Sequence, residues 1–146
     1  MDWLNQYEFS DVQMRSVVAG MKEMSAVDGD EDPQEIELIE QVCEGVQGPF
    51  ELDFAVFDTS ESKVAFMNLV TFVAIVDTNI NDDEWRLMES YVSSLGLSDG
   101  VQHFVDSVGE PFLRTVFADS EILKIWVPRL KEALRLGDDV VERLLA

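Results

Sequence analysis

Two acidic segments with matching surroundings constrain the fold of this chain more than any other feature. The first runs from Asp28 to Glu35, and the second runs from Asp77 to Glu84. In both, an apolar run ends in Asp, and Glu follows seven positions later at the head of a new apolar run. The two Asp residues stand 49 positions apart, at 28 and 77. The pattern therefore indicates a duplicated unit of helix, acidic segment and helix.

Helical periodicity runs along most of the chain, and no stretch shows sustained alternation with a period of two. We therefore expect an all-α fold, a compact bundle of about six to eight helices with an internal αα-hairpin repeat. The 146 residues are expected to form a single domain, 1–146, with repeat units at about 11–47 and 59–96 and further helices over 98–146. The segment 64–76 is apolar nearly all round, so its helix should lie at the centre of the bundle.

Capping residues mark where the helices should begin and end. The expected N-caps are Ser10 or Asp11, Asp32, Thr59 or Ser60, Asn81, and Asp119 or Ser120, and the expected stops include Gly45, Gly96 and Gly137. Residues 51–58 are ambiguous between a short helix and a turn. Cys43 is interpreted as a core residue, because it shares the apolar face of Ile36 and Ile39.

Charge excludes some classes of partner. The chain carries 30 acidic against 10 basic residues, a net charge of −20, which argues against binding to nucleic acid or to anionic membrane surfaces. The remaining options are cations, a basic protein partner, or an acidic surface that serves solubility alone.

Three further features bear on location. The single cysteine rules out a disulfide framework. The first residues lack the pattern of a signal peptide, and the longest apolar stretch, of thirteen residues with polar interruptions, is too short to cross a membrane. We therefore expect a cytoplasmic protein without membrane insertion.

Helix capping explains part of each acidic segment without any ligand. Glu35 and Glu84 occupy the third helical position, where a Glu side chain can bond back to the N-cap amide. Asp28 and Asp77 instead lie at helix C-termini, where the helix dipole disfavours a carboxylate. Loop amides or a bound divalent cation could offset that cost.

A true EF-hand loop is excluded. Asp28, Asp30 and Asp32 match its first, third and fifth positions, but the sixth position is Pro33 in place of Gly and the twelfth is Ile39 in place of Glu. The second segment has Asp77, Asn79 and Asn81 at the odd positions and fails at the same two places. Any cation held by these oxygen ligands should be Ca²⁺ or Mg²⁺.

The spacing resembles the TerB-like (tellurite-resistance protein B) family over about residues 11–118. Its first motif resembles residues 24–29 (Met-Ser-Ala-Val-Asp-Gly) with Glu35, and its second resembles residues 74–77 (Ala-Ile-Val-Asp) with Glu84, followed by Leu-Gly-Leu at 95–97. The second segment departs from the motif, because it has Thr78 in place of Gly and Asn in place of acids.

The resemblance implies a compact helical domain with a role in stress response or as an accessory module. It also implies divalent cation binding through the acidic segments. The match to the EF-hand spacing adds Asp32 to the residues that the resemblance implies. The expected metal ligands are therefore Asp28, Asp30, Asp32, Glu35, Asp77, Asn79 and Glu84.

Catalytic equipment is sparse. His103 is the single histidine, and its neighbours Asp99 and Asp106 favour a surface ion pair over catalysis. We predict no catalytic residues and no enzyme activity. The expected function is a non-enzymatic accessory protein that binds a cation and a protein partner. The alternative is a metal-free module whose acidic face binds a basic protein.

Overall fold

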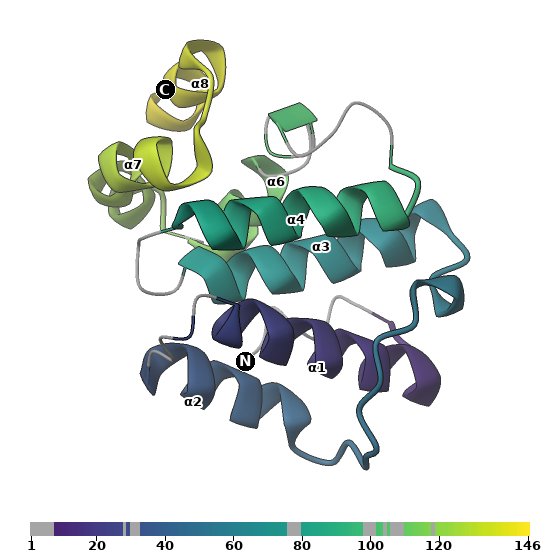
Figure 1. The fold of residues 1–146 in the computed structure, drawn as a ribbon. Coiled ribbons are helices and arrows are strands. Elements are labelled where there is room, and N and C mark those ends of the chain that lie inside the picture. Colours follow the sequence, from purple (N-terminus) through teal and green to yellow (C-terminus); the bar gives the residue numbers. More distant parts are fainter. Residues whose placement is uncertain are drawn as a thin grey trace.

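Every regular element that the computed structural model describes is helical, which confirms the all-α prediction. The description covers residues 8–27, 29, 33–75, 80–97, 102–103, 105, 110–117 and 119–146. The elements are α1 (Asp11–Ala26), α2 (Pro33–Cys43), the 3₁₀ helix η2 (Phe54–Val56), α3 (Ser60–Ile75), α4 (Asp82–Ser94), α6 (Glu110–Val116), α7 (Ser120–Leu134) and α8 (Asp138–Leu145) (Figure 1). The ambiguous segment 51–58 thus contains one short helical turn.

Local capping sets most of the described helix boundaries. Ser10 and Gln13 form a capping box at the start of α1, in which the Gln13 amide donates to Ser10 Oγ at 3.2 Å and the Ser10 amide donates to Gln13 Oε1 at 2.9 Å. Asp119 caps α7 by accepting from the Glu121 amide at 2.9 Å. Gly45 and Gly96, just past α2 and α4, adopt φ values of +82° and +69°. These positions agree with the predicted caps and stops.

The end of α7 differs from the prediction. The helix ends at Leu134, and Arg135 takes the left-handed conformation at φ 53° that was expected of a glycine. Gly137 is instead the N-cap of α8. The left-handed residue lets the Leu136 amide donate to the Lys131 carbonyl at 3.1 Å, the hydrogen bond that closes a Schellman C-cap.

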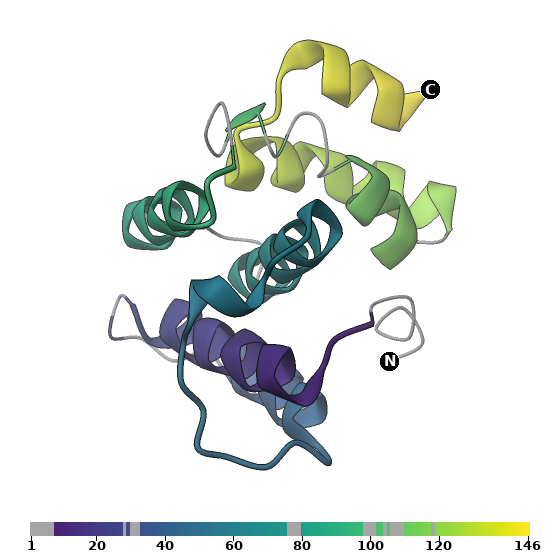
Figure 2. The ribbon, with the colours of Figure 1, turned by 90° about the vertical axis from the view of Figure 1, so that its right-hand side faces the viewer.

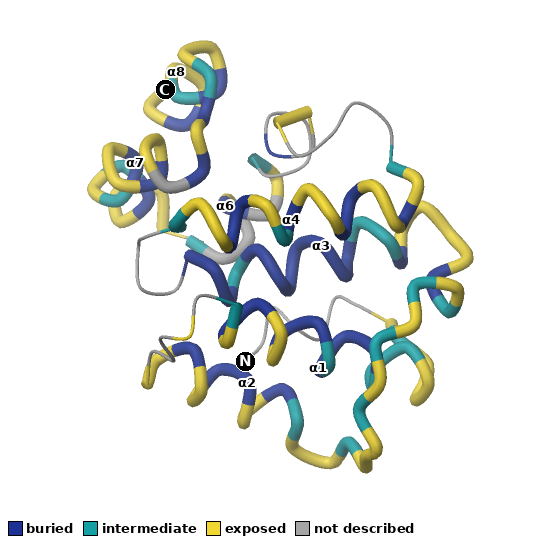
Figure 3. Tube along the Cα trace, viewed as in Figure 1, coloured by how far each residue is buried: buried dark blue, intermediate teal, exposed yellow. Residues whose placement is uncertain are grey.

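Helix α3 forms the centre of the fold. It packs against α1, α2, α4 and α7, and Figure 2 shows these helices around it. Figure 3 shows α3 buried along nearly its whole length, as the all-round apolar pattern of 64–76 predicts. Its larger fully covered apolar side chains are Phe66, Met67, Leu69, Val70 and Val73. Burial of each such side chain contributes roughly 1.5–3 kcal/mol to the stability of the folded state, so α3 anchors the bundle.

An aromatic cluster joins η2, α3 and α4. The Phe66 ring centroid lies 5.8 Å from that of Phe54, 4.8 Å from that of Phe57 and 5.4 Å from that of Tyr91. The Tyr91 hydroxyl donates to Glu23 Oε1 at 2.7 Å. Burial and this hydrogen bond raise the pKa of Tyr91, so its hydroxyl stays neutral and ties α4 to α1.

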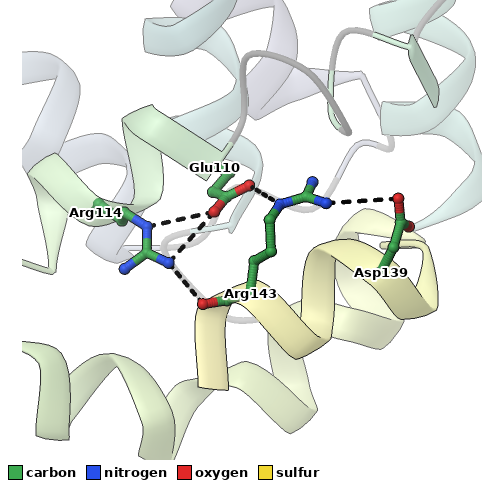
Figure 4. A network of polar contacts seen from close by, with 4 residues as sticks. All are labelled: Glu110, Arg114, Asp139 and Arg143. Atoms are coloured by element: carbon green, nitrogen blue, oxygen red, sulfur yellow. Dashed lines mark hydrogen bonds and ion pairs between the residues drawn. The ribbon is translucent and has the colours of Figure 1, made fainter. Parts of the chain in front are cut away.

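A charged network fastens α8 to α6. Glu110 Oε2 accepts from Arg143 Nε at 2.8 Å, and Glu110 Oε1 accepts from Arg114 Nη2 at 3.3 Å. Arg114 also donates to the Arg143 carbonyl at 2.7 Å, and Asp139 pairs with Arg143 at 3.6 Å (Figure 4). The Glu110 side chain is only 16% exposed, so this carboxylate is the hub of the network.

We expect the contribution of Glu110 to depend on pH. The hydrogen bond from Arg143 holds the pKa of Glu110 below its ordinary value of 4.5. A lowered pKa in the folded state gives stability that is full above pH 4.5 and is lost as the pH falls through the folded pKa. Glu110→Gln should lower Tm by about 2–4 °C at pH 7, and this difference should shrink below pH 4.5.

Scanning calorimetry between neutral and acidic pH measures this difference. Glu142→Gln, an exposed site on the same helix α8, is the matched control and should leave Tm nearly unchanged at every pH. A Glu110→Gln deficit that stays constant through the acidic range would contradict the assignment.

Helix length and hydropathy also bear on membranes. None of the helices in the described part of the chain is both long and apolar enough to span a bilayer. This finding agrees with the expectation of no membrane insertion.

Candidate functional site

The two helical hairpins return to the same end of the bundle. Figure 1 shows α1 running toward that end and α2 running back from it, and α3 and α4 do the same alongside. Contacts between α1 and α2, α1 and α3, α2 and α3, and α3 and α4 hold the four helices together. The C-termini of α1 and α3 and the N-termini of α2 and α4 therefore lie together, on the left in Figure 1.

Both predicted glutamate ligands are buried at this end. Glu35 is the third residue of α2 and is 3% exposed, and Glu84 is the third residue of α4 and is 4% exposed. Burying a carboxylate costs free energy unless hydrogen bonds or opposite charge compensate it. The repeat thus places the same costly group at the same position of both hairpins.

Glu84 is held by the capping box that the sequence predicts. The Glu84 amide donates to Asn81 Oδ1 at 2.8 Å, and the Asn81 amide donates to Glu84 Oε1 at 3.2 Å. The negative side chain also faces the positive end of the α4 dipole. Capping fixes the Glu84 carboxylate in position at this end of the bundle.

We expect the cap to account for the effect of Glu84 on stability in the absence of metal ions. Glu84→Ala removes the hydrogen bond to the Asn81 amide and should lower the free energy of unfolding by about 1 kcal/mol. Glu84→Gln keeps an oxygen acceptor at the third position and should stay close to wild type. Urea denaturation in EDTA measures both. Equal destabilisation by Gln and Ala would show that the charge, and not the cap, matters.

The other predicted ligands fall outside the described residues. They are Asp28, Asp30, Asp32, Asp77 and Asn79, so the expected N-cap of α2 at Asp32 also stays a prediction. Within the described ranges, no three His, Cys, Asp or Glu side chains are grouped so that they could hold a metal ion. Glu35 and Glu84 supply the hard oxygen atoms that Ca²⁺ and Mg²⁺ prefer.

An arginine just after α7 borders the second hairpin. Arg135 Nη2 pairs with Asp82 Oδ1 at 3.0 Å, and the Arg135 guanidinium lies 4.4 Å from the centroid of the Trp85 ring. Trp85 is only 6% exposed beneath this contact. The positive charge of Arg135 partly offsets the negative charge at the start of α4.

A groove of about 940 Å³ opens beside α2 and was not predicted from the sequence. Its apolar lining comes from Ile36, Ile39, Cys43 and Phe50. Three exposed glutamates also line it, namely Glu37, Glu40 and Glu44. Among the described residues that line the groove, Lys22 of α1 is the one basic residue, and its Nζ lies 4.4 Å from the centroid of the Phe50 ring.

The buried face of α2 is narrower than its apolar pattern predicts. Its buried residues are Glu35, Leu38, Ile39 and Val42. Cys43, interpreted from the sequence as a core residue, is only half-buried and lines the groove, and burial raises the pKa of its thiol. Ile36 and Cys43 lie at the edge of this buried face, beside the groove.

Among the described residues, no catalytic group of side chains surrounds the single histidine. His103 is exposed, and its predicted partners Asp99 and Asp106 lie outside the described residues.

Comparison with known proteins adds no family assignment. No protein-family model, no curated protein and no solved structure matches this chain. The TerB-like resemblance therefore rests on the motif residues at 24–29, 35, 74–77, 84 and 95–97, and it stays a prediction.

Proposed function

We propose that this chain is a non-enzymatic, TerB-like accessory protein of stress response that binds a divalent cation through its two acidic segments. One observation carries the proposal. The helix ends that border both segments lie at one end of the bundle, with a buried glutamate in the first turn of α2 and of α4. The proposed setting is the cytoplasm, which suits a chain whose only cysteine is a free thiol.

The chemistry of the donors supports a hard cation. The first segment carries Asp28, Asp30 and Asp32 within five residues, and buried Glu35 follows. Mutual repulsion among closely spaced carboxylates disfavours their ionised forms, and a divalent cation relieves that repulsion. We propose Ca²⁺ or Mg²⁺ as the cation, with the first segment as the stronger site.

Thermal unfolding with and without Ca²⁺ tests the proposal. At a concentration one hundred times Kd, bound Ca²⁺ should stabilise the wild type by about 2.7 kcal/mol. The double variant Asp28→Asn with Asp77→Asn should lose this gain. Glu132→Gln with Glu142→Gln removes the same charge from exposed sites on α7 and α8 and should keep it. A gain that persists in the Asp28 and Asp77 variant would show charge screening and contradict the proposal.

The groove favours a second candidate function. In that alternative the chain is a metal-free interaction module whose acidic face binds a basic protein. The observation behind it is the apolar lining of Ile36, Cys43 and Phe50 beside three exposed glutamates. The two candidates can be tested separately, because the groove variants described next leave both acidic segments unchanged.

A further inference from the structure

Helix α2 presents more apolar surface than the core covers. Ile36 is 36% exposed and Cys43 is half-buried, whereas Leu38 and Val42 on the inner face are each 5% exposed. Ile36 and Cys43 are seven residues apart, so the apolar strip extends over two helical turns, roughly 10 Å. A strip of this length matches the contact face of a partner helix with anchors at i, i+3 or i+4, and i+7.

Acidic residues run beside this strip with the same period. Glu37, Glu40 and Glu44 are spaced by three and four residues, are all exposed, and line the same groove. Against these three negative charges, the lining that the structure describes has one positive charge, Lys22, whose ammonium group lies over the Phe50 ring. The groove is therefore apolar along its length and negative along its rim.

We propose that this groove binds a basic amphipathic helix of a partner protein. Apolar side chains on one face of that helix would enter between α1 and α2, and Lys or Arg beside them would pair with Glu37, Glu40 and Glu44. The inference rests on the interaction role proposed above and specifies its partner; it requires no bound cation. Charge decides against the other occupants, because a second copy with net charge −20 and an anionic membrane would both bring negative charge to a negative rim.

Fluorescence anisotropy with a labelled synthetic peptide tests the proposal. The peptide has fourteen residues, with Leu at i, i+3 and i+7 on one face and Lys on both flanks, and a scrambled peptide of equal composition is its control. Binding is measured in EDTA, so a failure of the cation proposal does not affect the result. We expect the wild type to bind the amphipathic peptide about tenfold more tightly than the scrambled one.

Variants locate the binding to the groove. Glu37→Gln with Glu40→Gln and Glu44→Gln should weaken binding about tenfold, and Ile36→Ser should weaken it about fivefold. Lys22→Gln should strengthen binding about twofold, because it removes a positive charge that repels the basic peptide. A control variant with the same charge change, substituting Gln at Glu121, Glu132 and Glu142 of α7 and α8, should stay within about twofold of wild type.

Four outcomes would overturn the proposal. They are no measurable binding by the wild type, equal binding of the scrambled peptide, and equal weakening by the groove and control triple variants. The fourth is a wild-type dimer, seen by analytical ultracentrifugation, that Ile36→Ser dissociates, because a second copy would then be the occupant. Circular dichroism and urea denaturation confirm that each variant is folded.

Discussion

Phe66→Ala should lower the free energy of unfolding by about 3–5 kcal/mol. The Phe66 side chain is fully buried, and its ring packs against those of Phe54, Phe57 and Tyr91. Its removal leaves a cavity where α3 meets η2 and α4. A loss of that size is a large part of the 5–15 kcal/mol that holds a typical domain together.

Urea denaturation followed by circular dichroism measures this loss. Ile125→Ala on α7 is the matched control, because Ile125 is also apolar but is 75% exposed, and it should change the free energy of unfolding by less than about 0.5 kcal/mol. A Phe66→Ala loss below about 1.5 kcal/mol would contradict the central position of α3.

Gly20→Ala should destabilise the protein, although the same change in an exposed helix stabilises by up to about 1 kcal/mol. A Cβ at Gly20 would lie 2.7 Å from both Cε2 and Cζ of Phe66, and 3.4 Å from Cγ1 of Val70. The Phe66 ring is enclosed by other aromatic rings and has little room to move. We therefore expect a net loss of about 1–3 kcal/mol from overpacking between α1 and α3.

A double-mutant cycle separates the steric cost from the helix propensity. In a Phe66→Leu background the smaller side chain makes room, so Gly20→Ala should cost less there by at least about 0.5 kcal/mol. If Gly20→Ala raises stability in the wild-type background, the close packing of α1 against the Phe66 ring is contradicted.

Helix capping and apolar periodicity, which are both visible in the sequence, made much of the fold predictable. Side chains that bond to amides three residues away, as Ser10, Asn81 and Asp119 do, mark helix starts in the sequence itself. The all-round apolar pattern of 64–76 likewise predicted a central helix, because such a helix has no face suited to water.

Features that depend on tertiary packing were not predictable. Arg135 and Asp82 are 53 positions apart, and no local pattern links them. The contact of the Arg135 guanidinium with the Trp85 ring was therefore not predicted from the sequence. The exposed part of the α2 stripe was missed for a similar reason, because periodicity shows that a helix has an apolar face but not how far its neighbours cover it. The candidate ligands Glu35 and Glu84 were found from the repeat, whereas their nearly complete burial was not.

Isothermal titration calorimetry with Ca²⁺ and Mg²⁺ tests the central claim, cation binding by the acidic segments, most directly. At physiological ionic strength the wild type should give a saturable isotherm with a Kd in the millimolar range or tighter. The double variant Asp28→Asn with Asp77→Asn should give only the heat of dilution, while Glu132→Gln with Glu142→Gln should match the wild type. The absence of saturable binding of either cation by the wild type at millimolar concentrations would contradict the account.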